Sequence, residues 1–207
     1  MSSDSRSVRE VYAEGQRYFM GDGKLNNALS RLVADLNEHE IDYIVIGAIA
    51  LMAYGYPRFT EDIDLILTAD GLEKFHRELV GLGYVPAFQG ARKRLRSIRD
   101  RSPIEIIAAG EYPGDGKPKP VSFPSPPEAS VEIDGVRFAT LEKLIELKLA
   151  SGMTAPDRLK DLADVQEMIK IRSLDGEFAD KLNPYVQEKY FELLEAVERG
   201  RSNNIQE

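Results

Sequence analysis

Residues 42–68 read DYIVIGAIALMAYGYPRFTEDIDLILT, and this pattern is the most informative in the chain. An apolar run, residues 43–46, ends at Gly47. After a short segment of small residues and a Gly-Tyr-Pro turn, a second apolar run carries Asp62 and Asp64. The order is typical of a strand, a glycine turn, a short helix, a turn and a second strand.

Asp62 and Asp64 would project from the same face of the second strand, because alternate residues share a face. Two neighbouring carboxylates repel each other, and a bound divalent cation relieves that repulsion. Mg²⁺ suits such a pair because it takes one or two protein carboxylates and keeps positions for substrate phosphates. Alternation on a solvent-facing strand also produces such pairs, so the interpretation depends on neighbouring features.

Three such features favour a functional site. Gly47 ends one strand and opens a helix, where backbone N–H groups can approach a phosphate. Glu105 lies among apolar residues in a second predicted strand, residues 104–109. Arg58 and Thr60 directly precede the two aspartates, where they could reach an anion or brace a metal ion's ligands.

Composition excludes several classes of function. The 207-residue chain is 43% hydrophobic and 30% charged, as in soluble globular proteins. It has no apolar run of roughly 18 residues and no apolar N-terminal signal, which predicts a cytoplasmic protein without a membrane segment. The absence of cysteine excludes disulfides, thiolate metal sites and cysteine nucleophiles.

A net charge of −8 argues against a uniformly basic nucleic-acid binder. Residues 92–101 (RKRLRSIRDR) nevertheless carry +5, which leaves −13 on the rest of the chain. This segment is either a solvated strand and turn, or a strand on which Arg92, Arg94 and Arg96 share one face beside the acids. The second arrangement would suit a triphosphate or an RNA backbone.

The fold class expected is α/β (α+β), with a small mixed sheet followed by a helical C-terminal part. Residues 1–139 would form the core domain with N-terminal helices, and residues 140–207 the helical region that completes the cleft. Apolar spacing, caps and turn residues predict the elements. Helices are expected within 1–23, over 24–40, over 71–82, from Thr140, from about Asp157 and over 184–199. A strand is expected in 92–99, a proline-rich loop over 113–127 and a hairpin around Asp134-Gly135.

The run G-A-x(13)-D-I-D, from Gly47 to Asp64, resembles the motif of the nucleotidyltransferase superfamily with the DNA polymerase β fold. The fuller wording YGYPRFTEDID is similar to bacterial minimal nucleotidyltransferases that include the AbiEii-like toxins. LEKLIELKLASG and RLKDLADV resemble two further elements of those toxins, a leucine-rich helix with one lysine and an R-x-x-D-L-x-D element. The resemblance covers about residues 42–169.

The resemblance implies magnesium or manganese as cofactor and a nucleoside triphosphate such as ATP as substrate. By its motif Gly47 would bind the triphosphate, and Asp62 and Asp64 would hold metal ions. Glu105 would be the third acid, which also holds metal and helps to deprotonate the acceptor hydroxyl. Lys148 is nominated as both a catalytic and a nucleotide-binding residue. The other residues nominated for the nucleotide site are Ala48, Arg58, Thr60 and Asp161. Ala48 stands where the family has glycine or serine, so a hydroxyl on the phosphate is missing.

Two of these residues have a structural alternative. Lys148 projects from the apolar stripe of its helix, either as a lysine at the margin of that stripe or as an ammonium aimed at phosphate. Asp161 lies three residues after Arg158, and the two could simply pair on a helix surface.

The sequence therefore predicts an enzyme that moves a nucleotide from a triphosphate to a hydroxyl. Transfer to tRNA or another RNA, with an antitoxin as protein partner, is what the toxin resemblance implies. One alternative is a non-catalytic module of the same fold that binds nucleotide or a partner, which Ala48 favours. Another is an aminoglycoside-type antibiotic nucleotidyltransferase, whose cationic substrate would suit the acidic net charge.

Overall fold

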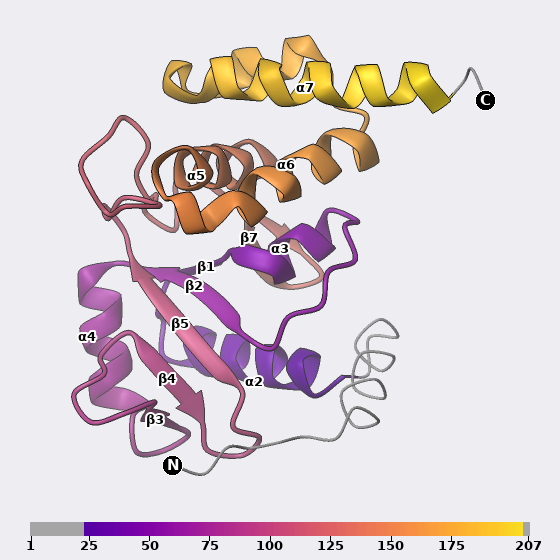
Figure 1. The fold of residues 1–207 in the computed structure, drawn as a ribbon. Helices are drawn as coiled ribbons and strands as arrows, with labels where there is room; N and C mark the ends of the chain where they lie inside the picture. The colour runs from indigo at the N-terminus through magenta and orange to yellow at the C-terminus, as the bar shows by residue number, and fades with distance from the viewer. Residues whose placement is uncertain (1–22, 205–207) are drawn as a thin grey trace.

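A single sheet of seven strands organises the protein, and the computed structural model describes residues 23–204 (Figure 1). The strand order is β3-β4-β5-β2-β1-β7-β6. The strands are β1 (Tyr43–Val45), β2 (Ile63–Leu67), β3 (Tyr84–Pro86), β4 (Arg94–Ser97), β5 (Pro103–Ala108), β6 (Ser130–Ile133) and β7 (Val136–Ala139). The helices are α2 (Lys24–Glu38), α3 (Gly47–Ala53), α4 (Ala69–Glu78), α5 (Leu141–Thr154), α6 (Leu159–Ile171) and α7 (Pro184–Asn204), with 3₁₀ turns at Pro156–Arg158 and Gly176–Lys181.

The central strands β1, β2 and β5 set the register of the site. β1 and β2 are antiparallel, whereas β2 and β5 run parallel, so the sheet is mixed. In the parallel pair Asp64 lies opposite Glu105, and Ile63 lies opposite Ile104. Residues opposite each other on neighbouring strands point to the same face, so this register places the two carboxylates side by side.

The two faces of β5 differ in exposure. Ile104 and Ile106 are buried in the core, whereas Glu105 between them is exposed. Helices α2 and α4 contribute buried apolar residues to the same core, and in Figure 1 they lie on the side away from the C-terminal helices. The opposite, acid-bearing face is therefore left to α3 and the C-terminal helices.

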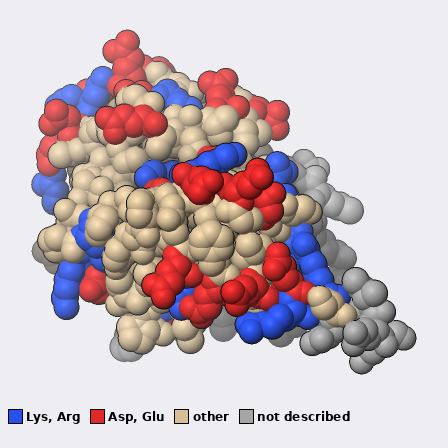
Figure 2. Space-filling view, turned by 90° about the horizontal axis from the view of Figure 1, so that it is seen from above, with Lys and Arg blue, Asp and Glu red and all other residues tan. Residues whose placement is uncertain are grey.

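The C-terminal helices stack above the sheet in two layers, with α7 outermost (Figure 1). The hydroxyl of Thr140 accepts a hydrogen bond from the Lys143 N–H and caps α5, as its sequence predicts. Figure 2 views the molecule from above, over α7, where several acidic patches alternate with basic side chains. This face has no continuous basic surface of the kind that follows a nucleic-acid backbone.

Several element boundaries differ from the sequence prediction. The helix expected over 71–82 begins at Ala69, because Thr68 caps it, and ends at Glu78. Its predicted last turn instead contains Gly81 at φ +92° and a largely exposed Leu82. The 24–40 helix ends two residues early, before Glu40 at φ 46°. Strand β3 is too short to produce an alternating pattern and was not predicted.

The predicted fold class is confirmed: a mixed sheet with helices, followed by a helical C-terminal part. The hairpin around Asp134-Gly135 is present, and residues 113–127 contain no helix or strand. The helix suggested within residues 1–23 lies almost entirely outside the described residues. Between residues 23 and 204 none of the helices combines the length and apolar character needed to cross a bilayer.

Candidate active site

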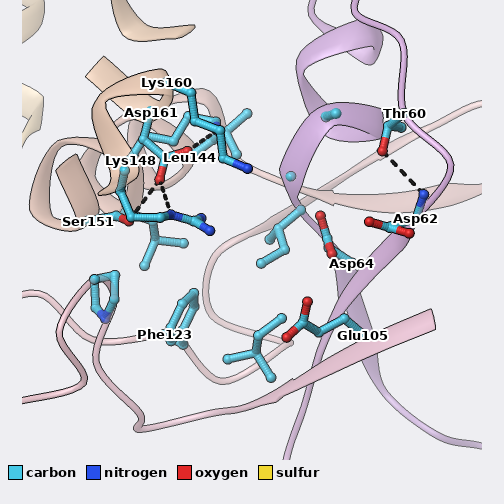
Figure 3. Close-up of a pocket in the computed structure, with 18 of the residues that line it drawn as sticks. Thr60, Asp62, Asp64, Glu105, Phe123, Leu144, Lys148, Ser151, Lys160 and Asp161 are labelled. Carbon is cyan, nitrogen blue, oxygen red and sulfur yellow. Dashed lines mark hydrogen bonds and ion pairs between the residues drawn. The ribbon is translucent and has the colours of Figure 1, made fainter. Parts of the chain in front are cut away.

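A cavity of about 260 Å³ lies between the acid-bearing face of the sheet and helices α5 and α6 (Figure 3). The turn from β1 into α3 and strands β2 and β5 form one wall. Helix α5, the start of α6 and parts of the loop between β5 and β6 form the other. All the residues nominated from the sequence line this cavity: Gly47, Ala48, Arg58, Thr60, Asp62, Asp64, Glu105, Lys148 and Asp161.

Gly47 lies so close to Asp64 that no side chain fits between them. A Cβ atom built on Gly47 would lie 2.0 Å from Oδ2 of Asp64. The residue also has φ +67°, in the left-handed region that glycine tolerates best. The Ile46 N–H donates to the Asp64 carbonyl at 3.0 Å, which holds the turn against β2. Glycine is thus required here by both backbone conformation and space.

Three carboxylates meet on the sheet side of the cavity. Asp62 and Asp64 are two residues apart in the chain, and Glu105 lies opposite Asp64 on β5. Figure 3 shows Asp64 and Glu105 pointing into the same space, with Asp62 beside them. The Thr60 hydroxyl accepts a hydrogen bond from the Asp62 N–H at 3.2 Å, so Thr60 braces the turn that carries this acid.

The electrostatics of this cluster disfavour full ionisation. Burial, together with the charges of Glu105 and Asp62, raises the pKa of Asp64 from 3.8 to about 6. Burial and the charges of Glu105 and Glu61 also raise the pKa of Asp62. No described residue donates a hydrogen bond to the carboxylate of Asp62 or Asp64. The charges of Lys148 and Arg158 offset the repulsion at Asp64 only in part, and those of Lys160 and Arg94 offset it only in part at Asp62.

This donor set fits a hard divalent cation, which prefers oxygen ligands. A cation between the acids would offset the repulsion that raises both pKa values. Within residues 23–204 no three Asp, Glu or His side chains already converge closely enough to hold a metal ion. Glu105 is about half exposed, and its Oε1 lies 3.6 Å from Nε of Arg94. Because that contact is long and solvated, Glu105 can leave it at little cost.

Lys148 anchors the helical wall through buried ion pairs. Its ammonium donates to Oδ1 of Asp161 at 3.0 Å and to Oδ2 of Asp164 at 2.7 Å. Arg58, which comes from the loop before β2, donates to the same Asp164 oxygen at 2.6 Å. The lysine therefore borders the cavity, and it is a paired buried cation instead of one at the margin of its helix.

Asp161 is held from three sides. Besides Lys148, it accepts hydrogen bonds from Ser151 Oγ and Arg158 Nε, each at 2.8 Å. Burial would raise the pKa of Asp161, but the charge and hydrogen bond of Lys148, with those of Ser151 and Arg158, lower it. The expected Arg158 pair exists, but its interpretation as a surface pair is wrong, since Asp161 is only 2% exposed.

The basic segment is divided between the two faces of the sheet. Arg94 lies opposite Glu105 in the β4–β5 ladder, next to the acids. Arg92 precedes β4 and pairs with Glu73 on α4. The prediction that Arg92, Arg94 and Arg96 share one face is therefore wrong for Arg92, because the strand begins two residues after it.

Sequence reasoning missed several residues of this site. Arg158 and Lys160 line the cavity, and Asp164 joins Lys148 to Arg58. Arg158 and Asp164 belong to the R-x-x-D-L-x-D element, so its second acid was an available signal. Phe123 reaches the cavity from the proline-rich loop, where no periodicity could identify it.

No protein-family model matches this chain, and no curated protein matches it by sequence. Among solved structures it is similar to ANT(2'')-Ia in complex with adenylyl-2''-tobramycin, at 17% identity, over 85% of this chain and 97% of that chain, with a TM-score of 0.50. A second is an antigenic nucleotidyltransferase-like protein from Paracoccidioides brasiliensis, at 19% identity over 72% of this chain and 76% of that chain, with a TM-score of 0.46. A third is JHP933 from Helicobacter pylori, at 16% identity over 98% of this chain and 100% of that chain, with a TM-score of 0.45. The likeness to ANT(2'')-Ia shows that this chain shares the fold of that protein.

Replacing Gly47 with alanine tests the close approach to Asp64. We expect Gly47→Ala to lower the unfolding free energy by about 2–3 kcal/mol, through the positive φ and the clash together. Gly55→Ala is the matched control, because Gly55 has φ +94° but its nearest neighbour would be 3.7 Å away. Denaturant titration should show the smaller loss for Gly55→Ala. Equal losses in the two variants would contradict the clash.

The raised pKa of Asp64 predicts a pH-dependent effect of Asp64→Asn on stability. The pKa of Asp64 is about 6 in the folded protein, above its value of about 4 in the unfolded chain. The cost of ionising Asp64 in the fold is therefore absent below about pH 4, grows between about pH 4 and 6 and is complete above that range. At pH 8 we expect the variant to be more stable than the wild type by about 1–2 kcal/mol, after allowance for solvent screening. The two should converge near pH 4. Thermal unfolding across this pH range measures the difference, and a pH-independent difference would contradict the repulsion.

Asp164→Asn tests the buried ion pairs. Removing this charge leaves Lys148 and Arg58 with one fewer buried partner, so we expect a loss of about 3 kcal/mol in unfolding free energy. Glu167→Gln on the same helix is the control, because its pair with Lys170 is solvent-exposed and should be worth about 0–1 kcal/mol. Chemical denaturation distinguishes the two, and a loss below about 1 kcal/mol for Asp164→Asn would show that the network is not stabilising.

Proposed function

We propose that the protein is a metal-dependent nucleotidyltransferase that moves a nucleoside monophosphate from a triphosphate to a hydroxyl acceptor. One observation carries the proposal: three clustered carboxylates, on β5, on β2 and directly before β2, face basic side chains of α5 and α6 across a single cavity. An anionic substrate with a bound cation is complementary to both walls. The nucleotidyltransferase-like fold supports the same conclusion.

Asp62, Asp64 and Glu105 would hold Mg²⁺ or Mn²⁺. A cation bound there supplies charge stabilisation to the reacting phosphate and to the leaving pyrophosphate. Glu105 would exchange its long contact with Arg94 for the cation when substrate enters. The raised pKa values of Asp62 and Asp64 would fall at that point, so cation binding should release protons below about pH 6.

The basic wall would bind the triphosphate. Arg158 and Lys160 line the cavity at the start of α6, and Lys148 lies behind them, held by Asp161 and Asp164. In this arrangement Asp161 positions Lys148 and Arg158 and does not itself touch the anionic phosphates. Across the cavity, Gly47 and Ala48 offer backbone without bulky side chains, so a phosphate can approach the main chain closely.

The reaction would proceed by attack of the acceptor oxygen on the α-phosphorus. A new P–O bond forms as the bond to pyrophosphate breaks, and the hydroxyl proton passes to a carboxylate. Glu105 is suited to accept it, because its side chain is about half exposed and it lines the cavity. Positioning and electrostatics supply most of the catalysis, so no nucleophilic side chain is needed.

We propose an RNA, such as the tRNA end, as the acceptor, in line with the toxin-like motifs and a cytoplasmic setting. An antitoxin would then be the protein partner. The exposed Arg94 and Arg96 beside the acids offer contacts to a nucleic-acid backbone next to the cavity. The face over α7, on which acidic and basic side chains alternate, offers no continuous basic surface for such a contact (Figure 2). An aminoglycoside acceptor is the second candidate, favoured by the net charge of −8.

Incubation with each labelled nucleoside triphosphate, Mg²⁺ or Mn²⁺ and total cellular RNA tests the proposal. We expect label to enter a discrete RNA band, and Asp64→Asn to reduce incorporation at least about 100-fold, because the cation loses a ligand. Asp134→Asn is the control: this exposed acid sits in the β6–β7 turn at φ 50°, which asparagine tolerates.

The outcomes separate the candidate functions. Label entering an aminoglycoside in place of RNA would identify the second candidate. Metal-dependent triphosphate binding without turnover on RNA, protein or small-molecule acceptors would favour the non-catalytic module, which the missing hydroxyl at Ala48 supports. Equal incorporation by the wild type and Asp64→Asn would refute nucleotidyl transfer at this site.

A further inference from the structure

The cavity has an apolar end as well as a charged one. Ile107 follows Glu105 by two residues on β5, so both point to the same face, one apolar and one acidic. Phe123, from the loop between β5 and β6, and Leu144, from α5, also line the cavity. In Figure 3 Phe123 and Asp62 lie at opposite sides of the cavity. A nucleotide has the same polarity, with phosphates at one end and an aromatic base at the other.

Phe123 is held in place by the backbone and keeps its ring available. The Gly110 N–H donates to the Phe123 carbonyl, and the Phe123 N–H donates to the Glu111 carbonyl, both at 2.8 Å. These two bonds hold Phe123 against Gly110 and Glu111, which closely follow β5. The ring is only partly buried, and no aromatic or cationic side chain in the described part of the chain stacks on it.

The rest of this loop is clamped onto α5. The ammonium of Lys119 donates to the Pro113 carbonyl at 2.5 Å, to Asp115 at 2.6 Å and to the Thr154 hydroxyl at 3.4 Å. Its side chain is 5% exposed, which is unusual for a lysine in a loop. Gly114, at φ +75°, passes so close to Thr154 that a Cβ there would lie 2.2 Å from its hydroxyl oxygen. These contacts hold the loop against α5, where it forms an ordered wall of the cavity.

We propose that Phe123, with Ile107 and Leu144, forms the subsite for the nucleobase, and that Lys119 positions the loop that carries it. This inference rests on the proposed function and adds the residues that recognise the base. Stacking on a phenylalanine ring accepts any base, because every base has an aromatic face. Tyr54 and Tyr56 could stack a base by type, but neither lines the cavity, and the Tyr54 hydroxyl donates to the Ala139 carbonyl.

The test compares a ligand that has a base with one that lacks it. Binding of each nucleoside triphosphate and of inorganic tripolyphosphate, both with Mg²⁺, is measured by calorimetry on the full chain. We expect wild-type protein to bind the nucleotides more tightly. Phe123→Ala should weaken nucleotide binding by about 5- to 100-fold while leaving tripolyphosphate within about 2-fold. Phe123→Tyr should retain nucleotide binding, whereas Phe123→Leu should lose most of the preference because it lacks a ring.

Lys119→Met should reproduce the selective loss of nucleotide binding, since the ring would no longer be held at the cavity. Lys117→Met is the matched control, because Lys117 is an exposed lysine of the same loop. Thermal unfolding of each variant shows that the fold is retained. A change that only destabilises the fold would weaken the binding of nucleotide and of tripolyphosphate alike, so a selective loss of nucleotide affinity indicates the base subsite.

The remaining outcomes overturn the inference in distinct ways. Equal affinity of wild-type protein for nucleotide and tripolyphosphate, or unchanged nucleotide binding by Phe123→Ala, would exclude the base subsite while leaving nucleotidyl transfer intact. If Phe123→Ala raised only the KM for the acceptor in the transfer assay, the wall that carries Phe123 would be an acceptor surface and the base subsite would be excluded. Failure of wild-type protein to bind either ligand, without any transfer, would refute the proposed function and this inference together.

Discussion

The ion pairs around Asp164 hold the two walls of the cavity together. Lys148 comes from α5, Asp164 from α6 and Arg58 from the loop that precedes β2, so one carboxylate joins two consecutive helices to a loop 106 residues earlier in the chain. Charges removed from water are tolerated only when they are paired, which makes these contacts mutually dependent. The position of the helical wall over the sheet, and with it the shape of the cavity, depends on this network.

The acids on the two walls are in opposite electrostatic situations. Asp161 is surrounded by Lys148, Ser151 and Arg158, and its pKa is lowered because these partners outweigh its burial. Asp64 is buried beside Glu105 and Asp62, and its pKa is raised to about 6, first by burial and then by their charges. A carboxylate that is paired with cations and hydrogen-bond donors stabilises the fold. A carboxylate that faces other acids destabilises it until a bound cation offsets the repulsion. This contrast distinguishes the positioning acids from the candidate metal ligands more clearly than residue type does.

Close approach is the second constraint on the site. Gly47 and Gly114 each leave no room for a side chain, the first against Asp64 and the second against Thr154. Both glycines also have a positive φ. They lie on the sheet side and on the loop side of the same cavity. Main chain therefore forms part of both walls, which leaves the volume between them for a ligand.

The sequence by itself determined the local elements and the sheet side of the site. Apolar alternation with Asp62 and Asp64 at even spacing, and Gly47 at the end of a strand, predicted a strand-helix-strand unit with two acids on one face. Glu105 could be nominated because an acid between two isoleucines is conspicuous. These patterns are short-range, since each is imposed by the period of a strand or helix within a few residues.

Only the tertiary structure decided which distant residues meet. The parallel register of β2 and β5 set Glu105 opposite Asp64, and burial turned Asp161 from a possible surface residue into part of a network with Lys148. Phe123 and Lys119 acquired their places from loop contacts that have no periodicity. The reason is physical: local patterns report which face a side chain takes, whereas the pairing of buried charges and the packing of irregular loops depend on segments far apart in the chain.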